Sequence, residues 1–593
     1  MKKNPFVLCF FLLFFFKTAD SIPSWKTYYE SHQKQQTPDY NNTIEFSKKL
    51  AANSSLLHFT SFGQSHENRD LPLLILDKNG NNTVETVKSS GNKILMIQAA
   101  IHPGEPAGKD AGLILFRDMI IHGKHTEYLE NITILFIPIV NVDGHERFGP
   151  YNRINQNGPK EMGWRTNARN INLNRDYLKA DSKEMRAFLK LWHHWEPDFF
   201  IDTHSTNGGD YQYTLTWAME IYGGTDNRLV NWKKEKYLPA VEEKMEADGY
   251  PIFPYVTYRS WHDPRSGLRS WVGNPMYSNS YVSHLNRPAL LIETHMLKPY
   301  EERVHATHQM ILHTLDVLHH DTALKSVIEK VDKYTASPEF RETPFPLLFE
   351  PTTDSVMVDF LGVEYIRKES TLSGGDWFIY DSTQPTTYQV PYFNSHRVSE
   401  DVNLPAAYII PPAYKNIADR LALHNIEMYQ LREPQKIEVE TYRFSEVELS
   451  GRSTEGRQTA SFKVNALTEM RNFPAQSIIL PIEQRQARII AHALEPLAPG
   501  SFAHWGFFNA VFERVEYFES YVMEEMAREM LSNDPSLKNR LEKVLEKNPA
   551  MAENPYAILS WFYEQTPYYD QQHNLYPVGR VMDTLYLEEL ERF

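Results

Sequence analysis

Four short apolar runs, separated by segments with helical periodicity, do most to constrain how the first 335 residues fold. The runs are Lys93–Ala100, Ile132–Val140, Asp198–Asp202 and Ala289–Ile292. Continuous apolar runs of this kind are typical of strands that are covered on both faces. Between them, Pro106–Ile121 and Ser182–Trp195 carry apolar residues at helical spacing. Strands that alternate with helices predict an α/β fold with a mixed, largely parallel sheet flanked by helices.

The length of 593 residues exceeds what one ordinary core supports, so several domains are expected. Prolines cluster after residue 336, and short strand-like segments then recur to about residue 500. From about residue 501 the pattern becomes helical. We therefore expect an α/β domain over residues 24–335, a mixed but β-rich accessory domain over 336–500, and a helical C-terminal region over 501–593.

The N-terminus has the pattern of a secretory signal peptide, which we place at residues 1–21. Lys2 and Lys3 precede an apolar stretch from Phe6 to Phe16, and Ala19 and Ser21 offer small residues for cleavage. The stretch is too short to span a bilayer as a mature helix. We expect a secreted or periplasmic protein with no stable membrane span in the mature chain; an uncleaved anchor is the alternative.

Cysteine content and charge exclude several kinds of site. The single cysteine, Cys9, lies inside the predicted signal peptide. A mature chain without thiols has no cysteine nucleophile, and its metal ligands must be histidines and carboxylates. A formal net charge of -15 lacks the basic footprint of a nucleic-acid binder, so no nucleic-acid partner is expected.

His102, Glu105 and His204 form a candidate metal site. His102 and Glu105 come just after the first apolar run and are separated from each other by a Pro-Gly turn. His204 comes just after the third run. Carboxyl ends of parallel strands meet at one edge of a sheet, where ligands bind. Two imidazoles and one carboxylate leave a coordination position open, which is typical of catalytic zinc. Alone, each residue has a plainer explanation, such as a buried structural histidine.

Glu293 directly follows the fourth apolar run. A carboxylate is costly to bury there without a role or a partner. Beside a metal it could act as a general base for a water molecule and then return the proton to a leaving amine. The alternative is a structural ion pair with Arg287 or Lys298.

Two arginine-bearing segments lie between the second and third runs. Arg165 stands in W-R-T-N, and Asn174-Arg175 stand in N-L-N-R-D. An arginine beside a metal can stabilise the oxyanion that develops on a scissile carbonyl. An Asn-Arg pair suits recognition of a carboxylate. A solvated loop arginine is the alternative for each position.

The order H-P-G-E, W-R-T-N…N-R-D, D-T-H and L-I-E-T resembles the M14 (carboxypeptidase A-like) zinc metallocarboxypeptidases. The resemblance covers about residues 25–330. It implies that His102, Glu105 and His204 hold one zinc ion (Zn2+), and that Glu293 is the general base. It also implies the zinc carboxypeptidase fold for this part of the chain.

The same resemblance assigns the substrate-binding residues. Arg165 would assist the carbonyl, while Asn174 and Arg175 would hold the free C-terminal carboxylate of a substrate. Tyr281, with Tyr277 as the other candidate, would be the substrate-binding tyrosine. The chain departs from the family pattern in three ways. Asn172 replaces an aspartate that often orients a zinc histidine, and the substrate-binding tyrosine has no clear position. The specificity loop, near residues 271–280, carries no acidic residue, which disfavours a strict preference for C-terminal lysine or arginine.

The expected function is that of a zinc-dependent metallocarboxypeptidase, which hydrolyses C-terminal peptide bonds with a zinc-bound water activated by Glu293. Its partner would be a peptide or protein with a free C-terminus. One alternative is a zinc amidohydrolase acting on N-acyl amino acids or cell-wall peptides. Another is a non-catalytic binding protein built on a pseudo-peptidase domain. The sequence does not indicate an oligomeric state.

Overall fold

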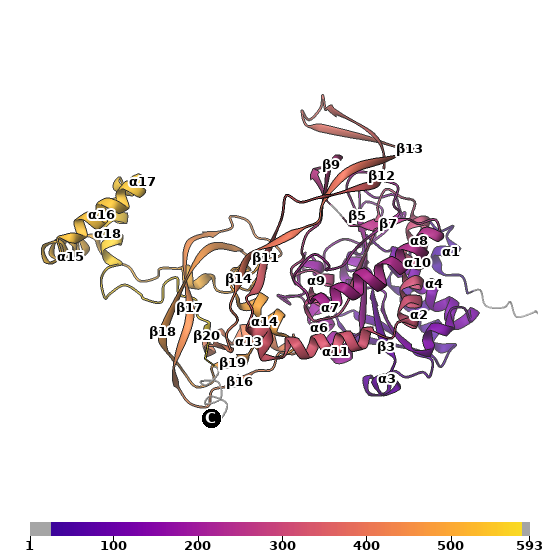
Figure 1. Ribbon diagram of the computed structural model, residues 1–593, viewed down its shortest axis with the longest axis horizontal. Helices are drawn as coiled ribbons and strands as arrows, with labels where there is room; N and C mark the ends of the chain where they lie inside the picture. Colours follow the sequence, from indigo (N-terminus) through magenta and orange to yellow (C-terminus); the bar gives the residue numbers. More distant parts are fainter. Residues whose placement is uncertain (1–24, 256, 584–593) are drawn as a thin grey trace, which may run out of the picture.

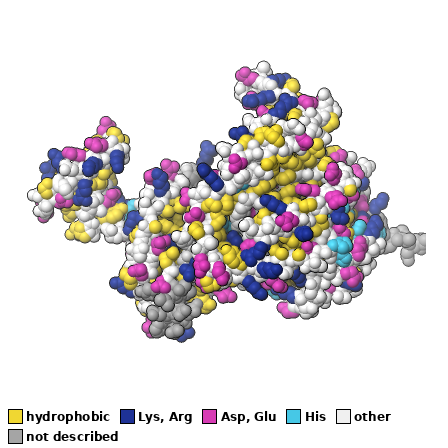
Figure 2. All heavy atoms as spheres, in the orientation of Figure 1, with side chains coloured by type: hydrophobic (Ala, Val, Ile, Leu, Met, Phe, Trp, Pro, Cys, Tyr) yellow, Lys and Arg dark blue, Asp and Glu magenta, His cyan; other side chains and the backbone are white. Residues whose placement is uncertain are grey.

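The computed structural model describes residues 25–255 and 257–583 (Figure 1). The predicted signal peptide, residues 1–21, lies outside the described residues. In the described part of the chain, no helix is long and apolar enough to cross a membrane. Lys, Arg, Asp and Glu side chains are interspersed over the face of the molecule that Figure 2 shows.

An eight-stranded mixed sheet forms the centre of the first 335 residues. Its strand order is β1-β2-β4-β3-β5-β10-β6-β7. The pairs β4-β3, β3-β5, β5-β10 and β6-β7 are parallel, whereas β1-β2, β2-β4 and β10-β6 are antiparallel. The strands are β1 Leu57–Gln64, β2 Asp70–Leu76, β3 Lys93–Gln98, β4 Ile132–Ile137, β5 Phe199–Thr206, β6 Leu215–Ala218, β7 Ile252–Pro254 and β10 Ala289–His295. The predicted mixed, largely parallel sheet is confirmed.

Helices cover both faces of this sheet (Figure 1). In β3, Leu95 and Ile97 enter the core that includes α4, whereas Met96 enters the core that includes α6. Successive strand residues face opposite sides, so a strand covered on both sides needs apolar residues at every position. The helices of this region are α1 Tyr28–Ser31, α2 Tyr40–Ala52, α3 Val84–Ser90, α4 Ala107–His122, α5 Val142–Glu146, α6 Lys183–Trp195, α7 Asn227–Trp232, α8 Leu238–Ala247, α9 Ser278–His284, α10 Tyr300–His320 and α11 Leu324–Thr335.

The two central strands that carry site residues extend further than their apolar runs. β5 continues to Thr206 and β10 continues to His295. The polar residues of the two strands pair in parallel register, with Glu293 opposite His204. His204 and Glu293 therefore lie within strands and not beyond their ends. The apolar runs mark only the first part of each strand.

A second, six-stranded sheet follows, with the order β16-β19-β15-β20-β17-β18. A long hairpin, β12-β13, also extends the β9-β8 hairpin of the first region. Strand β20, formed near the end of the chain, lies between β15 and β17, so the predicted helical region 501–593 also supplies a strand. The division into domains at residues 335 and 500 stays a prediction. The strands are β8 Thr257–Ser260, β9 Asp263–Arg269, β11 Phe345–Pro351, β12 Val356–Glu369, β13 Asp376–Phe393, β14 His396–Val402, β15 Ala407–Ile410, β16 Tyr429–Gln430, β17 Gln435–Leu449, β18 Ala460–Phe473, β19 Ile478–Pro481 and β20 Gly579–Val581.

The remaining helices fall into two groups. Near the second sheet lie α12 Pro338–Arg341, α13 Lys415–Ala422 and α14 Ala487–Leu494. The last four are α15 Ser520–Asn533, α16 Ser536–Lys547, α17 Pro549–Ala552 and α18 Pro555–Tyr563, which form a small lobe set apart from the rest of the molecule (Figure 1). That lobe has its own apolar cluster, in which Met523 and Ala527 pack with Leu559 and Phe562.

Candidate active site

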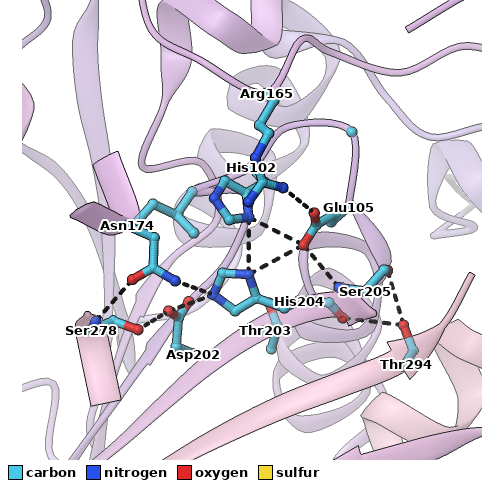
Figure 3. Close-up of polar contacts among 12 residues, drawn as sticks. His102, Glu105, Arg165, Asn174, Asp202, Thr203, His204, Ser205, Ser278 and Thr294 are labelled. Carbon is cyan, nitrogen blue, oxygen red and sulfur yellow. Dashed lines mark hydrogen bonds and ion pairs between the residues drawn. The ribbon is translucent and has the colours of Figure 1, made fainter. Parts of the chain in front are cut away.

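His102, Glu105 and His204 converge at the carboxyl ends of β3 and β5 (Figure 3). Nδ1 of His102 lies 3.3 Å from Oε2 of Glu105, and Nδ1 of His204 lies 3.1 Å from Nδ1 of His102. Nδ1 of His204 is also 3.2 Å from Oε2 of Glu105. Tetrahedral zinc with bonds of about 2.0–2.1 Å separates its ligand atoms by about 3.3 Å. The three buried side chains therefore present the edges of such a tetrahedron.

Both imidazoles are held by their other ring nitrogen. Nε2 of His102 lies 2.9 Å from Oδ1 of Asn172, and Nε2 of His204 lies 2.7 Å from Oδ2 of Asp202. Since both partners are acceptors, each imidazole donates through Nε2, which leaves Nδ1 as the atom that can bind a metal. The departure at Asn172 thus keeps the hydrogen bond but not the charge of the more usual aspartate.

Burial and charge set the protonation of this cluster. Burial lowers the pKa of His102 to about 4, so this imidazole is a neutral ligand at pH 7. Burial also opposes charge on His204, but the adjacent Asp202 outweighs it and raises the pKa of His204 well above its usual value. Without a metal, His204 is therefore protonated on Nδ1, and a metal cation bound at Nδ1 would replace this proton.

Glu293, on β10, lines one cavity together with His102, Glu105 and His204, which we call the metal-ligand cluster because these three residues could hold a metal ion. Its backbone is paired with His204 in the parallel ladder. Among the described residues, its buried Oε2 has no hydrogen-bond partner. Burial raises the pKa of Glu293 to about 8. The sequence alternative of a structural ion pair is not realised, because Arg287 pairs with Asp332 and Lys298 pairs with Asp210.

Two arginines contact the outer oxygen of Glu105. Nη1 of Arg165 lies 3.1 Å and Nη1 of Arg153 lies 2.9 Å from Oε1 of Glu105. Arg153 was not among the predicted residues. Its side chain crosses Gly104, where an added Cβ would lie 2.8 Å from Cγ of Arg153. In the sequence, only Gly104 indicated that another side chain could pass close to this turn, and it did not indicate which one.

Asn174 and Arg175 reach the cavity from a short 3-10 turn, Leu173–Arg175. Oδ1 of Asn174 accepts from the backbone N–H of Ser278 at 2.9 Å, which fixes the orientation of the amide (Figure 3). The guanidinium of Arg175 stacks on Tyr277, 4.5 Å from its ring centroid. Its Nη1 donates to the carbonyl of Asn174 at 2.7 Å, and the Arg175 side chain lines the cavity.

A cavity of about 730 Å³ joins these groups. Its wall includes seven of the eight predicted residues: His102, Glu105, Arg165, Asn174, Arg175, His204 and Glu293.

Tyr281 does not line the cavity, so the structure contradicts its assignment to substrate. It is fully buried in α9, and its hydroxyl lies 2.8 Å from Nδ1 of His424. Tyr277, at the N-cap of α9, lines the cavity instead. Tyr255 is the other tyrosine in the cavity wall.

Residues 43–302 match the zinc carboxypeptidase family, Peptidase_M14. This segment belongs to that family. The match covers the metal-ligand cluster, both arginine-bearing segments and Glu293, and it classes the chain among peptidase hydrolases. Carboxypeptidase 2 from Trichophyton rubrum is 22% identical over 489 residues, which span 79% of this chain and 84% of that protein. Carboxypeptidase 2 from Trichophyton equinum is 22% identical over 488 residues, with the same coverage.

Solved structures of similar proteins include carboxypeptidases. The carboxypeptidase A from Helicoverpa armigera has a TM-score of 0.37 and 12% identity, and the match covers 49% of this chain and 75% of that one. A metallo-carboxypeptidase from Pseudomonas aeruginosa has a TM-score of 0.35 and 18% identity, with coverage of 47% and 69%.

Proposed function

We propose that this protein is a zinc carboxypeptidase that hydrolyses the C-terminal peptide bond of peptides or proteins with a free carboxylate. The observation that carries the proposal is the joint placement of the His102, Glu105 and His204 cluster, Glu293 and Arg175 around one cavity. A metal-ligand cluster and a general base support hydrolysis. The nearby Asn174-Arg175 pair supports cleavage at a chain end.

His102, Glu105 and His204 would hold the zinc ion, since two imidazoles and one carboxylate match the donors of catalytic zinc sites. When bound, zinc supplies Lewis acidity that polarises a water molecule and the scissile carbonyl. The contacts of Arg165 and Arg153 with Oε1 of Glu105 leave Oε2 turned toward the two histidines.

Glu293 would take the proton from the attacking water and deliver it to the amine nitrogen as the peptide bond breaks. Arg165 would donate hydrogen bonds to the oxyanion that forms on the scissile carbonyl. Arg175 and Asn174 would bind the terminal carboxylate, which places the last peptide bond beside Glu293. Arg175 suits this task because its planar guanidinium already stacks on Tyr277.

The cavity wall favours uncharged C-terminal side chains. Tyr255 and Trp271 contribute aromatic surface, and the carboxylates among the described lining residues are Glu105 and Glu293. A lysine or arginine side chain would therefore lack a dedicated acidic partner. We also propose that the protein is exported, on the strength of the predicted signal peptide at residues 1–21.

A matched pair of peptides tests the proposal. One peptide ends in phenylalanine with a free carboxylate, and the other carries the same sequence with an amidated C-terminus. The zinc-loaded protein should release phenylalanine from the first and lose nearly all of that rate on the second. Equal cleavage of both peptides would contradict a carboxypeptidase and favour an amidohydrolase. No cleavage of either, or of a free-acid peptide library, would favour a binding protein.

A further inference from the structure

The loop that carries the candidate carboxylate-binding residues is held from outside by the C-terminal half of the chain. We call residues 172–182 the substrate loop. Arg457 donates through Nε and Nη2 to the two carboxylate oxygens of Asp181, at 2.6 and 2.7 Å. Arg420 adds a contact of 2.9 Å to Asp181 and donates to the carbonyl of Ala180 at 3.0 Å. These contacts bring the β17-β18 hairpin loop, residues 450–459, against the substrate loop.

Within that hairpin loop, Glu455 approaches the metal-ligand cluster most directly. The backbone N–H of Asn172 donates to Oε2 of Glu455 at 2.7 Å. Oδ1 of the same Asn172 lies 2.9 Å from Nε2 of His102. One residue therefore connects the carboxylate of Glu455 to a candidate zinc ligand.

The backbone of Glu455 gives a second, independent observation. Thr454 and Arg457 exchange backbone hydrogen bonds of 2.8 and 3.0 Å across a tight turn. The two central residues, Glu455 and Gly456, have φ values of 51° and 76°. Such turns favour asparagine, aspartate or glycine at both central positions, and glutamate is disfavoured there. The turn alone does not account for a glutamate at this position, whereas the contact with Asn172 does.

We propose that Glu455 is a positioning residue for the metal site. Its carboxylate holds Asn172 in place, so that the amide oxygen of Asn172 orients His102. It also places beside Asn172 the negative charge that an aspartate at position 172 would have carried. A negative charge near the partner of a metal-bound imidazole raises the basicity of that ligand. The proposal rests on the proposed function in one respect, that the cluster binds zinc.

The proposal gives the C-terminal half of the chain a part in the chemistry. Residues 455 and 172 are far apart in the sequence but adjacent in space, so the accessory region completes the support of a zinc ligand. A purely structural clamp would need only the ion pairs of Asp181 with Arg420 and Arg457.

Zinc affinity of full-length variants tests the proposal. The variants are Glu455→Ala, Glu455→Gln and the control Glu448→Ala, which changes an exposed glutamate on β17 of the same hairpin. Affinity is measured by competition with a chromogenic zinc chelator, and the melting temperature is recorded for each variant.

We expect Glu455→Ala to weaken zinc binding by about 10-fold, the lower end of the range for residues that support metal ligands. Glu455→Gln keeps a hydrogen-bond acceptor but loses the charge, so it should weaken binding several-fold. Glu448→Ala should match the parent.

Zinc affinity within about twofold of the parent for Glu455→Gln would overturn the proposal, whatever the melting temperatures. If Glu455→Ala fails to fold, Glu455→Gln decides by the same criterion. The chelator assay contains no peptide, so a parent that binds zinc but leaves free-acid peptides intact contradicts the proposed function alone. A parent that does not bind zinc contradicts both.

Discussion

Glu293 lies opposite His204 in the parallel ladder of β10 and β5, so two adjacent strands and not a flexible loop set the spacing between the candidate base and a candidate metal ligand. Sites built on strands hold their geometry better than sites built on loops. Arg165, Asn174 and Arg175 come from connecting segments instead, where more hydrogen bonds are needed to fix them.

The substitution Glu293→Gln should remove most of the hydrolytic rate while leaving the metal site intact. A glutamine cannot accept the proton of the attacking water, and loss of a general base costs roughly 10²–10⁴ in rate. The measurements are kcat on a free-acid peptide and the zinc content of the purified variant. The control is Glu45→Gln, an exposed glutamate in α2. A variant with parent-like kcat would show that Glu293 is not the base.

The sequence predicted that His102, Glu105, His204 and Glu293 lie together, because each stands at a fixed place relative to an apolar run. It did not predict Arg153 or Glu455, since each comes from a loop whose approach depends on tertiary packing. Tyr281 was assigned wrongly for a related reason. Tyr277 lies at the N-cap of α9 and lines the cavity, whereas Tyr281 lies within the helix and packs against His424, which is far along the chain.

At the scale of elements, α4 lies unusually close to the central sheet. A Cβ added at Gly108 would lie 2.0 Å from Oγ1 of Thr203 in β5, and one added at Gly112 would lie 2.2 Å from Cζ of Phe136 in β4. Because these two glycines have no side chain, α4 can pack closely against β4 and β5. The periodicity of apolar residues predicted α4 itself. It did not predict this close contact, because the spacing of apolar residues does not indicate the distance between a helix and a sheet.

Gly108→Ala should destabilise the protein, although alanine is the better helix former by about 1 kcal/mol. The new methyl group collides with Thr203, and overpacking of this kind costs about 1–3 kcal/mol. Thermal unfolding of the variant should show a lower melting temperature. Gly451→Ala serves as the control, because a Cβ at Gly451 meets nothing within 4 Å. A melting temperature at or above that of the parent would contradict the close approach of α4.

At the scale of the whole molecule, Glu196 joins the two halves of the chain. It ends α6 and pairs with Lys88 at 2.8 Å on one side and with Arg485, between β19 and α14, on the other. Burial alone would raise the pKa of Glu196, but the hydrogen bonds and charges of Lys88 and Arg485 outweigh it and lower the pKa to about 2. The sequence predicted three regions of different character but gave no sign of which residues join the first of them to the second.

Glu196→Gln should lower stability at pH 7, and the loss should shrink in acid. Because the folded pKa lies below the usual value of 4.5, ionised Glu196 stabilises the fold fully above about pH 4.5. That contribution disappears as the pH falls toward about 2. Solvent screens these partly exposed pairs, so the expected loss lies at or below about 1.5 kcal/mol, the lower end of the range for one hydrogen bond to a charged group.

The check is the difference in melting temperature between parent and variant at pH 7 and at pH 3.5. Glu127→Gln, an exposed glutamate, should show no difference at either pH. A Glu196→Gln difference that stayed constant across this range would rule out ionisation of Glu196 as its source.

Strand β20 has a consequence for how the protein is made. Residues 579–581 lie between β15 and β17, so an interior strand of the second sheet comes from near the end of the chain. During synthesis from the N-terminus, β16, β19 and β15 on one side and β17 and β18 on the other can each pair early. They can join into one sheet only after residue 581 has left the ribosome, because β20 is the strand between them. The last strand of the central sheet, β10, also lies between two earlier strands, β5 and β6, but it ends at residue 295. The central sheet can therefore close while the second sheet is still being translated.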